Sequence, residues 1–202
     1  MLFRSMDYRA GNIRSVETAL RLLGADFVVS GSPEVLRSCD KLVIPGDGEA
    51  RAVMSVLAET GLGELIREFF RKGNPILGIC IGCQIVLDRS EERDARCLGL
   101  IPGEFRRFPN RPGFKLPHMG WNAVLHDGSH PIFRGVRSGE ACYFVHSYYP
   151  VPRDERHRIA RTGYGFDFAC AVARDNLTAL QFHPEKSAAP GLRMVENFVR
   201  LI

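Results

Sequence analysis

The sequence has no long apolar run and no block of basic residues, and each absence removes a class of protein. No apolar stretch approaches the about 20 residues of a membrane span. Arg4 and Asp7 stand close behind Leu2 and Phe3, so the start of the chain does not resemble a signal peptide. The net charge is only +4, and the basic residues are scattered. We therefore expect a protein that binds neither membranes nor nucleic acid.

The cysteines lack the regular spacing of a disulfide framework. The six cysteines are Cys39, Cys80, Cys83, Cys97, Cys142 and Cys170. This usage predicts a reduced protein of the cytoplasm. The histidines at 118, 126, 130, 146 and 157 show no metal-ligand spacing with cysteine or carboxylate. We expect no metal and no cofactor.

Strand and helix patterns alternate in the first half of the chain. Asn12 is suited to cap a helix whose apolar residues recur at helical spacing until Gly24. The expected elements are helices at 13–23, 50–59 and 65–72, and strands at 25–29, 41–44 and 75–79. This order predicts an α/β fold with a mostly parallel central sheet and helices on both faces.

The second half is less regular. Residues 98–130 are rich in Gly, Pro, Arg and Phe, which favours loops and edge hairpins. Strand patterns return at 141–146, 158–162, 168–173 and 177–182, and a helix pattern closes the chain at 191–201. At 202 residues, without repeats or linkers, the chain fits a single domain over 1–202.

The most informative stretch places a cysteine on a sharp turn. An apolar strand pattern ends at Gly78-Ile79-Cys80-Ile81-Gly82, and a helix pattern follows. Glycines on both sides relieve crowding around a strained nucleophile, as in the serine elbow of hydrolases. The N–H groups of the following helix point toward the sulfur and favour thiolate. Cys80 is thus a candidate nucleophile.

A second constellation supplies the groups that such a nucleophile needs. An apolar strand pattern ends at Gln181-Phe182-His183, and Pro184 and Glu185 follow. A cysteine nucleophile requires a base, and the base requires a carboxylate that fixes its tautomer. Because ligands bind at the carboxyl ends of parallel strands, Cys80, His183 and Glu185 are expected to meet there.

The stretches that contain Cys80 and His183 together resemble the class I, triad-type glutamine amidotransferases, which have a flavodoxin-like fold. Four further strings narrow the resemblance to the branch formed by the glutaminase subunits of imidazole glycerol phosphate synthases. They are DYRAGN (7–12), PGDG (45–48), KLPHMGWN (115–122) and YFVHSYY (143–149). The resemblance extends from the first strand to the last helix.

The resemblance implies a site that hydrolyses L-glutamine. Cys80 attacks the carboxamide, His183 moves the proton and Glu185 orients His183. The oxyanion lies against N–H groups of Ile81 and of the Asp47-Gly48 turn. The amino-acid end of glutamine is held by the side chains at four further positions: Gln84, Glu92, Ser147 and Tyr148. For Glu92 the alternative is a solvated residue in the charged run 91–94, and Ser147 and Tyr148 alternatively just end a strand.

The resemblance also implies a partner. Ammonia passes to a separate (β/α)8-barrel cyclase subunit, which makes imidazole glycerol phosphate and an aminoimidazole carboxamide ribotide in histidine biosynthesis. Asn12, Trp121, Asn122 and Lys186 match positions at that heterodimer interface. For Trp121 the alternative is a core residue, and for Lys186 it is a solvated charge.

Three departures from the family pattern matter. Arg4, Ser5 and Arg9 interrupt the first strand, which predicts a frayed strand and an altered loop. Asp47 replaces a valine of the oxyanion turn, and we expect its carboxylate to point away from the site. Cys83 replaces a methionine and creates a Cys-X-X-Cys spacing.

That spacing allows two further interpretations. A thioredoxin-like oxidoreductase also places Cys-X-X-Cys between a strand and a helix, but His183 and Glu185 would then have no role. A reversible Cys80–Cys83 disulfide that inactivates the enzyme is the second hypothesis.

The sequence also leaves open two other functions. One is a glutaminase that serves a different acceptor, such as a nucleotide-sugar amidation enzyme, and the other is a binding module without turnover.

Overall fold

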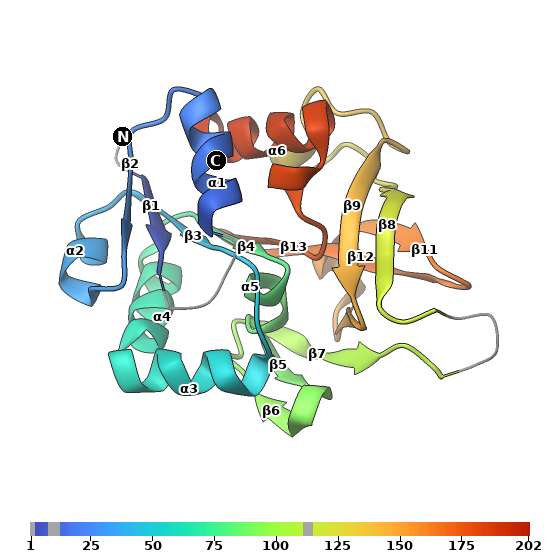
Figure 1. The fold of residues 1–202 in the computed structure, drawn as a ribbon, viewed down its shortest axis with the longest axis horizontal. Helices are drawn as coiled ribbons and strands as arrows, with labels where there is room; N and C mark the ends of the chain where they lie inside the picture. Colours follow the sequence, from blue (N-terminus) through green and yellow to red (C-terminus); the bar gives the residue numbers. More distant parts are fainter. Residues whose placement is uncertain (1–2, 8–12, 111–114) are drawn as a thin grey trace.

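The computed structural model describes residues 3–7, 13–110 and 115–202, and a seven-stranded sheet forms its centre (Figure 1). The parallel strands are, in spatial order, β13 (Leu177–Leu180), β4 (Ile76–Ile79), β3 (Lys41–Ile44), β1 (Phe3–Met6) and β2 (Phe27–Ser30). The antiparallel strands β12 (Asp167–Arg174) and β11 (Arg158–Gly163) extend the sheet beyond β13. The prediction of a mostly parallel sheet is confirmed.

Helices cover both faces of this sheet (Figure 1). One face carries α1 (Ile13–Leu22) and α6 (Ala188–Arg200), and the other carries α3 (Ala50–Thr60) and α4 (Leu62–Lys72). The short α2 (Pro33–Arg37), which the sequence pattern did not indicate, contacts α4. The predicted layers are confirmed.

The alternation of side chains along β3 explains the continuous apolar pattern of the parallel strands. Leu42 and Ile44 belong to the core beneath α3 and α4, whereas Val43 belongs to the core beneath α1 and α6. Because successive side chains point to opposite faces, a strand covered on both sides must be apolar at nearly every position.

A second, four-stranded sheet includes part of the stretch 98–130, where loops and edge hairpins were predicted. Its strands are, in order, β10 (Tyr148–Pro152), β7 (Ile101–Arg107), β5 (Leu87–Ser90) and β6 (Ala95–Arg96). The prediction is wrong for β7, because Pro102 and Gly103 disguise the strand pattern. A Cβ at Gly103 would lie 2.5 Å from the carbonyl oxygen of Val151, so glycine permits the pairing with β10.

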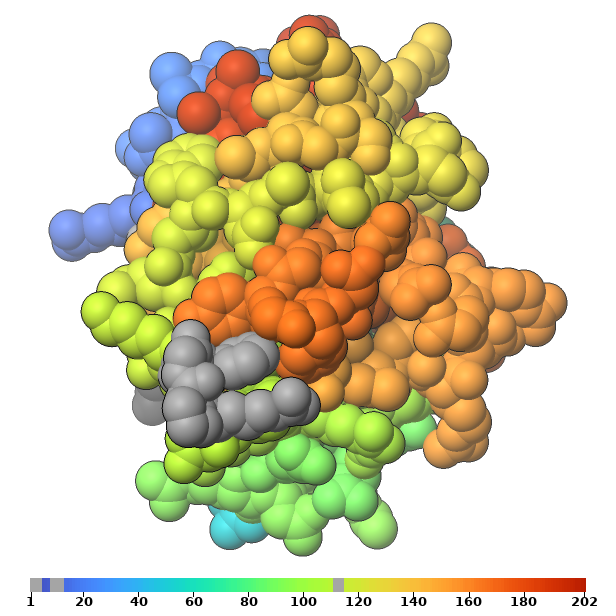
Figure 2. Space-filling view, turned by 90° about the vertical axis from the view of Figure 1, so that its right-hand side faces the viewer, coloured from blue at the N-terminus to red at the C-terminus, as the bar shows by residue number. Residues whose placement is uncertain are grey.

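A separate hairpin of β8 (His118–Ala123) and β9 (Ala141–His146) flanks the main sheet. The side of the molecule turned toward the viewer in Figure 2 is covered mainly by the yellow-to-orange middle of the chain, which includes this hairpin, β11 and β12. Single 3-10 turns complete the chain at η1 (Glu92–Asp94), η2 (Pro131–Phe133), η3 (Glu155–His157) and η4 (Pro184–Lys186).

Two local predictions need correction. The helix expected after Cys80 is the single turn α5 (Ile81–Gln84), after which the chain enters β5. An apolar run that is buried on all sides carries no period that separates helix from strand. The first strand is not frayed, because β1 pairs with β2 on one edge and with β3 on the other. The loop after it, including Asn12, lies outside the described residues.

No helix in the described ranges is both long enough and apolar enough to cross a membrane.

The last helix packs directly on the turn that carries Glu185. A Cβ at Gly191 of α6 would lie 2.0 Å from the carbonyl oxygen of Pro184 and 2.6 Å from the Cβ of Ser187. Real Cβ atoms do not approach backbone so closely, so only glycine allows α6 to approach η4 at this distance. This contact fixes one side of the turn.

We expect Gly191→Ala to lower the free energy of unfolding by about 1–3 kcal/mol, because the added methyl group overpacks a backbone contact. Gly63→Ala in α4 is the matched control, since the nearest atom to its Cβ would be 3.5 Å away. That control should be neutral or more stable by up to ~1 kcal/mol. Urea denaturation measures both, and equal stability of the two variants would show that the contact with η4 is not restrictive.

Candidate active site

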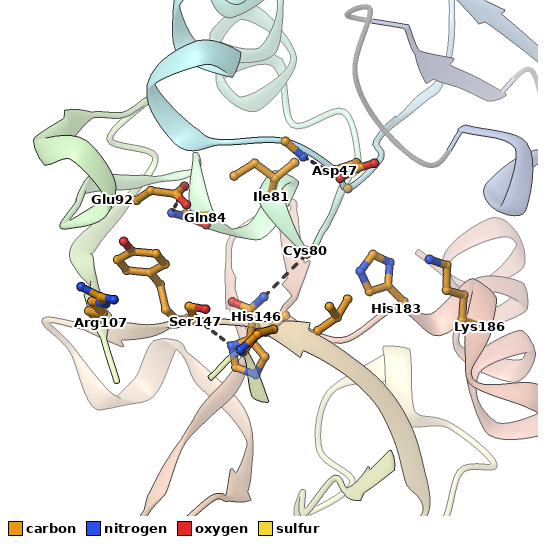
Figure 3. A pocket seen from close by; sticks show the side chains of 16 residues that line it. Asp47, Cys80, Ile81, Gln84, Glu92, Arg107, His146, Ser147, His183 and Lys186 are labelled. Atoms are coloured by element: carbon orange, nitrogen blue, oxygen red, sulfur yellow. Dashed lines mark hydrogen bonds between the residues drawn. The ribbon is translucent and has the colours of Figure 1, made fainter. Parts of the chain in front are cut away.

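A cavity of about 650 Å³ lies at the carboxyl ends of β3, β4 and β13 (Figure 3). The turn after β3, Cys80 after β4 and His183 after β13 all reach it. Ser147 and Tyr148, where β9 passes into β10, line its opposite side. Ligand sites in parallel α/β sheets occur at this edge. The cavity therefore brings the residues of the two chemical strings together.

Cys80 occupies a strained elbow. Its backbone angles are φ 51° and ψ −104°, which a residue with a side chain rarely adopts. A Cβ at Gly78 would lie 2.5 Å from the carbonyl oxygen of Gly82, and one at Gly82 would lie 2.4 Å from the carbonyl oxygen of Ile44. The prediction that flanking glycines relieve crowding is confirmed.

His183 and Glu185 form a buried pair. The Nδ1 atom of His183 lies 2.8 Å from Oε1 of Glu185, and the two side chains are 3% and 1% exposed. The N–H of His183 donates to the carbonyl of Tyr143 over 2.9 Å, and the hydroxyl of Ser187 donates to the carbonyl of His183 over 2.6 Å. With Nδ1 donating to the carboxylate, Nε2 is the nitrogen left for proton transfer.

The charge state of His183 follows from three competing effects. Burial disfavours its imidazolium form, but the interactions with Cys80 and with Glu185 outweigh burial and raise the pKa of His183 to about 9. The charged ring of His183 therefore interacts with the Cys80 side chain as well as with Glu185. The helix dipole that the sequence suggested is weak at this elbow, because α5 has only one turn.

The turn after β3 lies directly on the nucleophile. A Cβ at Gly46 would lie 2.5 Å from the Cβ of Cys80, so the backbone of this turn contacts the elbow. The expectation that Asp47 points away is wrong. Its carboxylate turns back on the turn, and Oδ1 accepts the N–H of Gly48 over 2.9 Å (Figure 3). A short side chain next to a free N–H makes this contact locally favourable.

The four residues expected to hold the amino-acid end of glutamine line the same cavity: Gln84, Glu92, Ser147 and Tyr148. Glu92 is not a solvated member of a charged run. Its Oε2 accepts the N–H of Ala50 over 2.8 Å and the Nε2 of Gln84 over 3.1 Å. Gln84 also donates to the hydroxyl of Ser90 over 2.7 Å. The carboxylate is thereby fixed at the cavity wall.

The residues expected at a partner interface separate into two places. Lys186 lines the cavity, on the His183 side of Cys80 (Figure 3). Trp121 and Met119 of β8 are 56% and 64% exposed, so Trp121 is not a core residue. Asn122 next to it donates to the carbonyl of Gly163 over 2.7 Å.

Cys83 faces away from the nucleophile. It is fully buried in the core beneath α3 and α4, whereas Cys80 packs against the core on the opposite face of the sheet. Burial raises the pKa of the Cys83 thiol well above its ordinary value, which opposes the thiolate that disulfide exchange requires. The geometry therefore lends no support to an oxidoreductase or to Cys83 as a resolving thiol.

Two polar residues are among the cavity residues that the sequence reasoning missed. His146 and Arg107 line the cavity beside Tyr148. The only sequence signal for His146 was its position at the end of a strand, two residues from Tyr148. Arg107 gave no such signal, because it lies in the stretch that was expected to form loops.

His146 belongs to a buried chain of hydrogen bonds. Its Nδ1 lies 2.7 Å from the carbonyl of Tyr148 and must donate there, so its Nε2 accepts from Nδ1 of His118 over 2.9 Å. The Nε2 of His118 then accepts from Nδ2 of Asn122 over 3.3 Å. Burial lowers the pKa of His118 to about 4 and that of His146 to about 3, so both rings are neutral at neutral pH. The chain links β8 to the wall of the cavity.

Across the part of the chain that the structure describes, no group of three His, Cys, Asp or Glu side chains is arranged to hold a metal ion.

Comparison with known proteins identifies the family of the chain. The family model described as glutamine amidotransferase class-I matches residues 5–202. The crystal structure of a glutamine amidotransferase superposes with a TM-score of 0.74 at 21% identity, covering 96% of this chain and 98% of that one. The structure of PurLQS from Thermotoga maritima superposes with a TM-score of 0.77 at 19% identity, covering 98% and 96%. The chain belongs to the class-I glutamine amidotransferase family.

Curated relatives indicate to which group within this family the chain belongs. A protein of Nitratidesulfovibrio vulgaris is 43% identical, with 96% of this chain and 94% of the relative covered. Relatives from Gloeobacter violaceus and Geobacillus thermodenitrificans are 44% and 43% identical, with 96% and 98% of this chain and 87% and 94% of the relatives covered. All three are named imidazole glycerol phosphate synthase subunit HisH. Within the family, this chain belongs to the group of these subunits.

The histidine chain predicts different effects for two substitutions of His146. Glutamine places its amide near the Nε2 position and loses the bond to the carbonyl of Tyr148, whereas asparagine places it near Nδ1 and keeps that bond. We expect His146→Gln to raise KM for glutamine about 3- to 10-fold, the equivalent of one hydrogen bond, and His146→Asn to raise it less. Steady-state kinetics measure both.

The matched control is His126, which is stacked on Phe133 at 4.2 Å and lies at a different hollow of the surface. His126→Asn should leave KM for glutamine unchanged. If His146→Gln and His146→Asn raise KM equally, the bond to Tyr148 does not position the cavity wall.

Proposed function

We propose that this chain is the glutaminase subunit of an imidazole glycerol phosphate synthase and hydrolyses L-glutamine with Cys80, His183 and Glu185. The observation that carries the proposal is the buried His183–Glu185 pair beside a cysteine on a strained elbow. Membership of the class-I glutamine amidotransferase family supports the substrate, and the named relatives support the pathway.

The proposed reaction proceeds through a thioester. The Cys80 sulfur attacks the carboxamide carbon of glutamine, and His183 gives its Nε2 proton to the departing nitrogen, which leaves as ammonia. A water molecule then loses a proton to His183 and attacks the γ-glutamyl thioester, which releases glutamate and restores the thiolate. Glu185 keeps the Nδ1 proton in place and stabilises the imidazolium in both steps.

The oxyanion of the tetrahedral intermediate requires N–H donors at the elbow. The Ile81 N–H at the start of α5 belongs to the first turn, whose donors have no partner within the helix. The Gly48 N–H is the second donor, and in the described conformation it is occupied by Asp47. Losing one oxyanion donor typically costs about 10²–10³ in rate. The proposed site therefore has a low basal rate until the turn rearranges.

The ammonia is proposed to pass to a (β/α)8-barrel cyclase subunit in a heterodimer, which produces imidazole glycerol phosphate and an aminoimidazole carboxamide ribotide. The exposed Trp121 and Met119 support a partner surface on β8, because they lie two residues apart on the same face of the strand and neighbouring exposed apolar side chains are typical of interaction sites. Asn12, Asn122 and Lys186 are proposed as further contacts. All six cysteines are free, which suits the cytoplasm as the proposed compartment.

The first prediction concerns the nucleophile. We expect Cys80→Ala to abolish ammonia release from glutamine, because no thioester forms, while binding of the cyclase subunit is retained. A coupled glutamate assay measures the first, and size-exclusion chromatography of the mixed subunits measures the second. Cys83→Ala is the matched control and should retain turnover, since Cys83 lies in the opposite core. Glutamine hydrolysis by Cys80→Ala would refute the mechanism.

The second prediction concerns the turn. Asp47→Ala frees the Gly48 N–H and removes a negative charge next to the developing oxyanion, so we expect kcat of the isolated chain to rise about 10- to 100-fold. Asp47→Asn keeps an acceptor for Gly48 but loses the charge, and its kcat should lie between those of the parent and Asp47→Ala. Unchanged kcat in both variants would show that Asp47 does not limit the reaction.

A further inference from the structure

Arg107 lines the cavity, and its guanidinium has no hydrogen bond to the residues that the structure describes. It is the last residue of β7 and pairs with Tyr148 of β10, so both side chains reach the wall of the cavity. Its backbone N–H donates to Glu91 over 2.7 Å, which fixes the strand end. Figure 3 shows the guanidinium on the same side of Cys80 as Glu92.

The neighbouring arginine provides the contrast. Arg106 points to the other face of β7, where its Nε and NH2 groups lie 2.8 and 2.7 Å from Oε1 of Glu104. The Arg107 guanidinium has no hydrogen bond or ion pair with any residue that the structure describes. Five donors in a planar fork thus face the cavity, in a geometry that matches a carboxylate.

Glu92 supplies the opposite charge nearby. Glu92 lines the cavity, and its side-chain hydrogen bonds from Ala50 and from Gln84 both go to Oε2, which leaves Oε1 available to a ligand. Burial raises the pKa of Tyr148 and the charge of Glu92 adds to this, whereas the charge of Arg107 lowers it. The Tyr148 phenol therefore lies within the fields of both groups, one anionic and one cationic.

This pair of charges fits one end of an amino-acid zwitterion. A ligand whose carboxamide lies at Cys80 and whose chain runs toward Gln84 brings its α-carbon between Glu92 and Arg107. The other cationic side chains that line the cavity, His183 and Lys186, lie on the opposite side of Cys80 from Glu92 (Figure 3). Arg107 is the cation on the correct side.

We propose that Arg107 binds the α-carboxylate of glutamine and, together with Glu92 on the α-ammonium, determines specificity for a free amino acid over a carboxamide that lacks the carboxylate. This inference rests on the proposed glutaminase function. It assigns a role to Arg107, which lies in neither of the two stretches, 78–82 and 181–185, that contain Cys80 and His183.

The test compares two substrates in three variants of the full chain. L-glutamine has the α-carboxylate, and L-glutamine α-amide replaces it by a neutral amide while retaining the α-amino group and the side-chain carboxamide. We expect Arg107→Gln to lower kcat/KM for L-glutamine about 10- to 100-fold, mainly through KM, which is the effect of losing a charged hydrogen-bonded pair. For the α-amide, kcat/KM should change less than about 3-fold. Arg107→Lys should recover part of the loss for L-glutamine.

Arg106→Gln is the matched control, because it removes the same charge from the opposite face of β7, and it should change neither substrate's kcat/KM. An equal loss on both substrates in Arg107→Gln, or no loss on L-glutamine, would overturn the inference. A parent chain that hydrolyses neither substrate, also in the presence of the cyclase subunit, would instead refute the proposed function. The two failures are thus distinguishable.

Discussion

The hydrogen bond between His183 and Glu185 is the constraint on which the site depends. It joins two side chains that are two residues apart in the chain, in a turn where both are almost completely buried. A carboxylate buried at such depth is costly without a partner, so the pair holds only while the histidine keeps its orientation. The parallel pairing of β13 with β4 places that histidine beside Cys80, and the close contact of α6 with η4 keeps the turn in position.

Two parts of the molecule contribute different halves of the site. The parallel sheet supplies the reacting groups, because its strand ends converge where β3, β4 and β13 stop. The second sheet and the β8–β9 hairpin supply the opposite wall of the cavity, which includes Ser147 and Tyr148. The hydrogen-bonded pair His118 and His146 ends at the carbonyl of Tyr148 in this wall. The hydrogen bonds of His118 and His146 therefore connect β8, which also carries the exposed Trp121, to the wall of the cavity.

The sequence predicted those parts of the fold whose signals are local. β3 and β9 were placed at their observed bounds, and the glycines around Cys80 correctly indicated the elbow. The second sheet was missed, because Pro102 and Gly103 stand inside β7 and its strands pair with partners distant in sequence. Arg107 was missed for the same reason, and the orientation of Asp47 was wrong, since a side chain that bonds its own neighbour leaves no periodic pattern.

The central claim is that Cys80 is the thiol that glutamine meets, and labelling with an electrophilic glutamine analogue tests it most directly. A diazo-ketone analogue of glutamine alkylates the thiolate that attacks the carboxamide position. Peptide mass spectrometry of the labelled chain should find one adduct, on Cys80, with the other five cysteines unmodified and with the labelling rate reduced by added glutamine. An adduct on a different cysteine, or labelling that glutamine does not slow, would contradict the account.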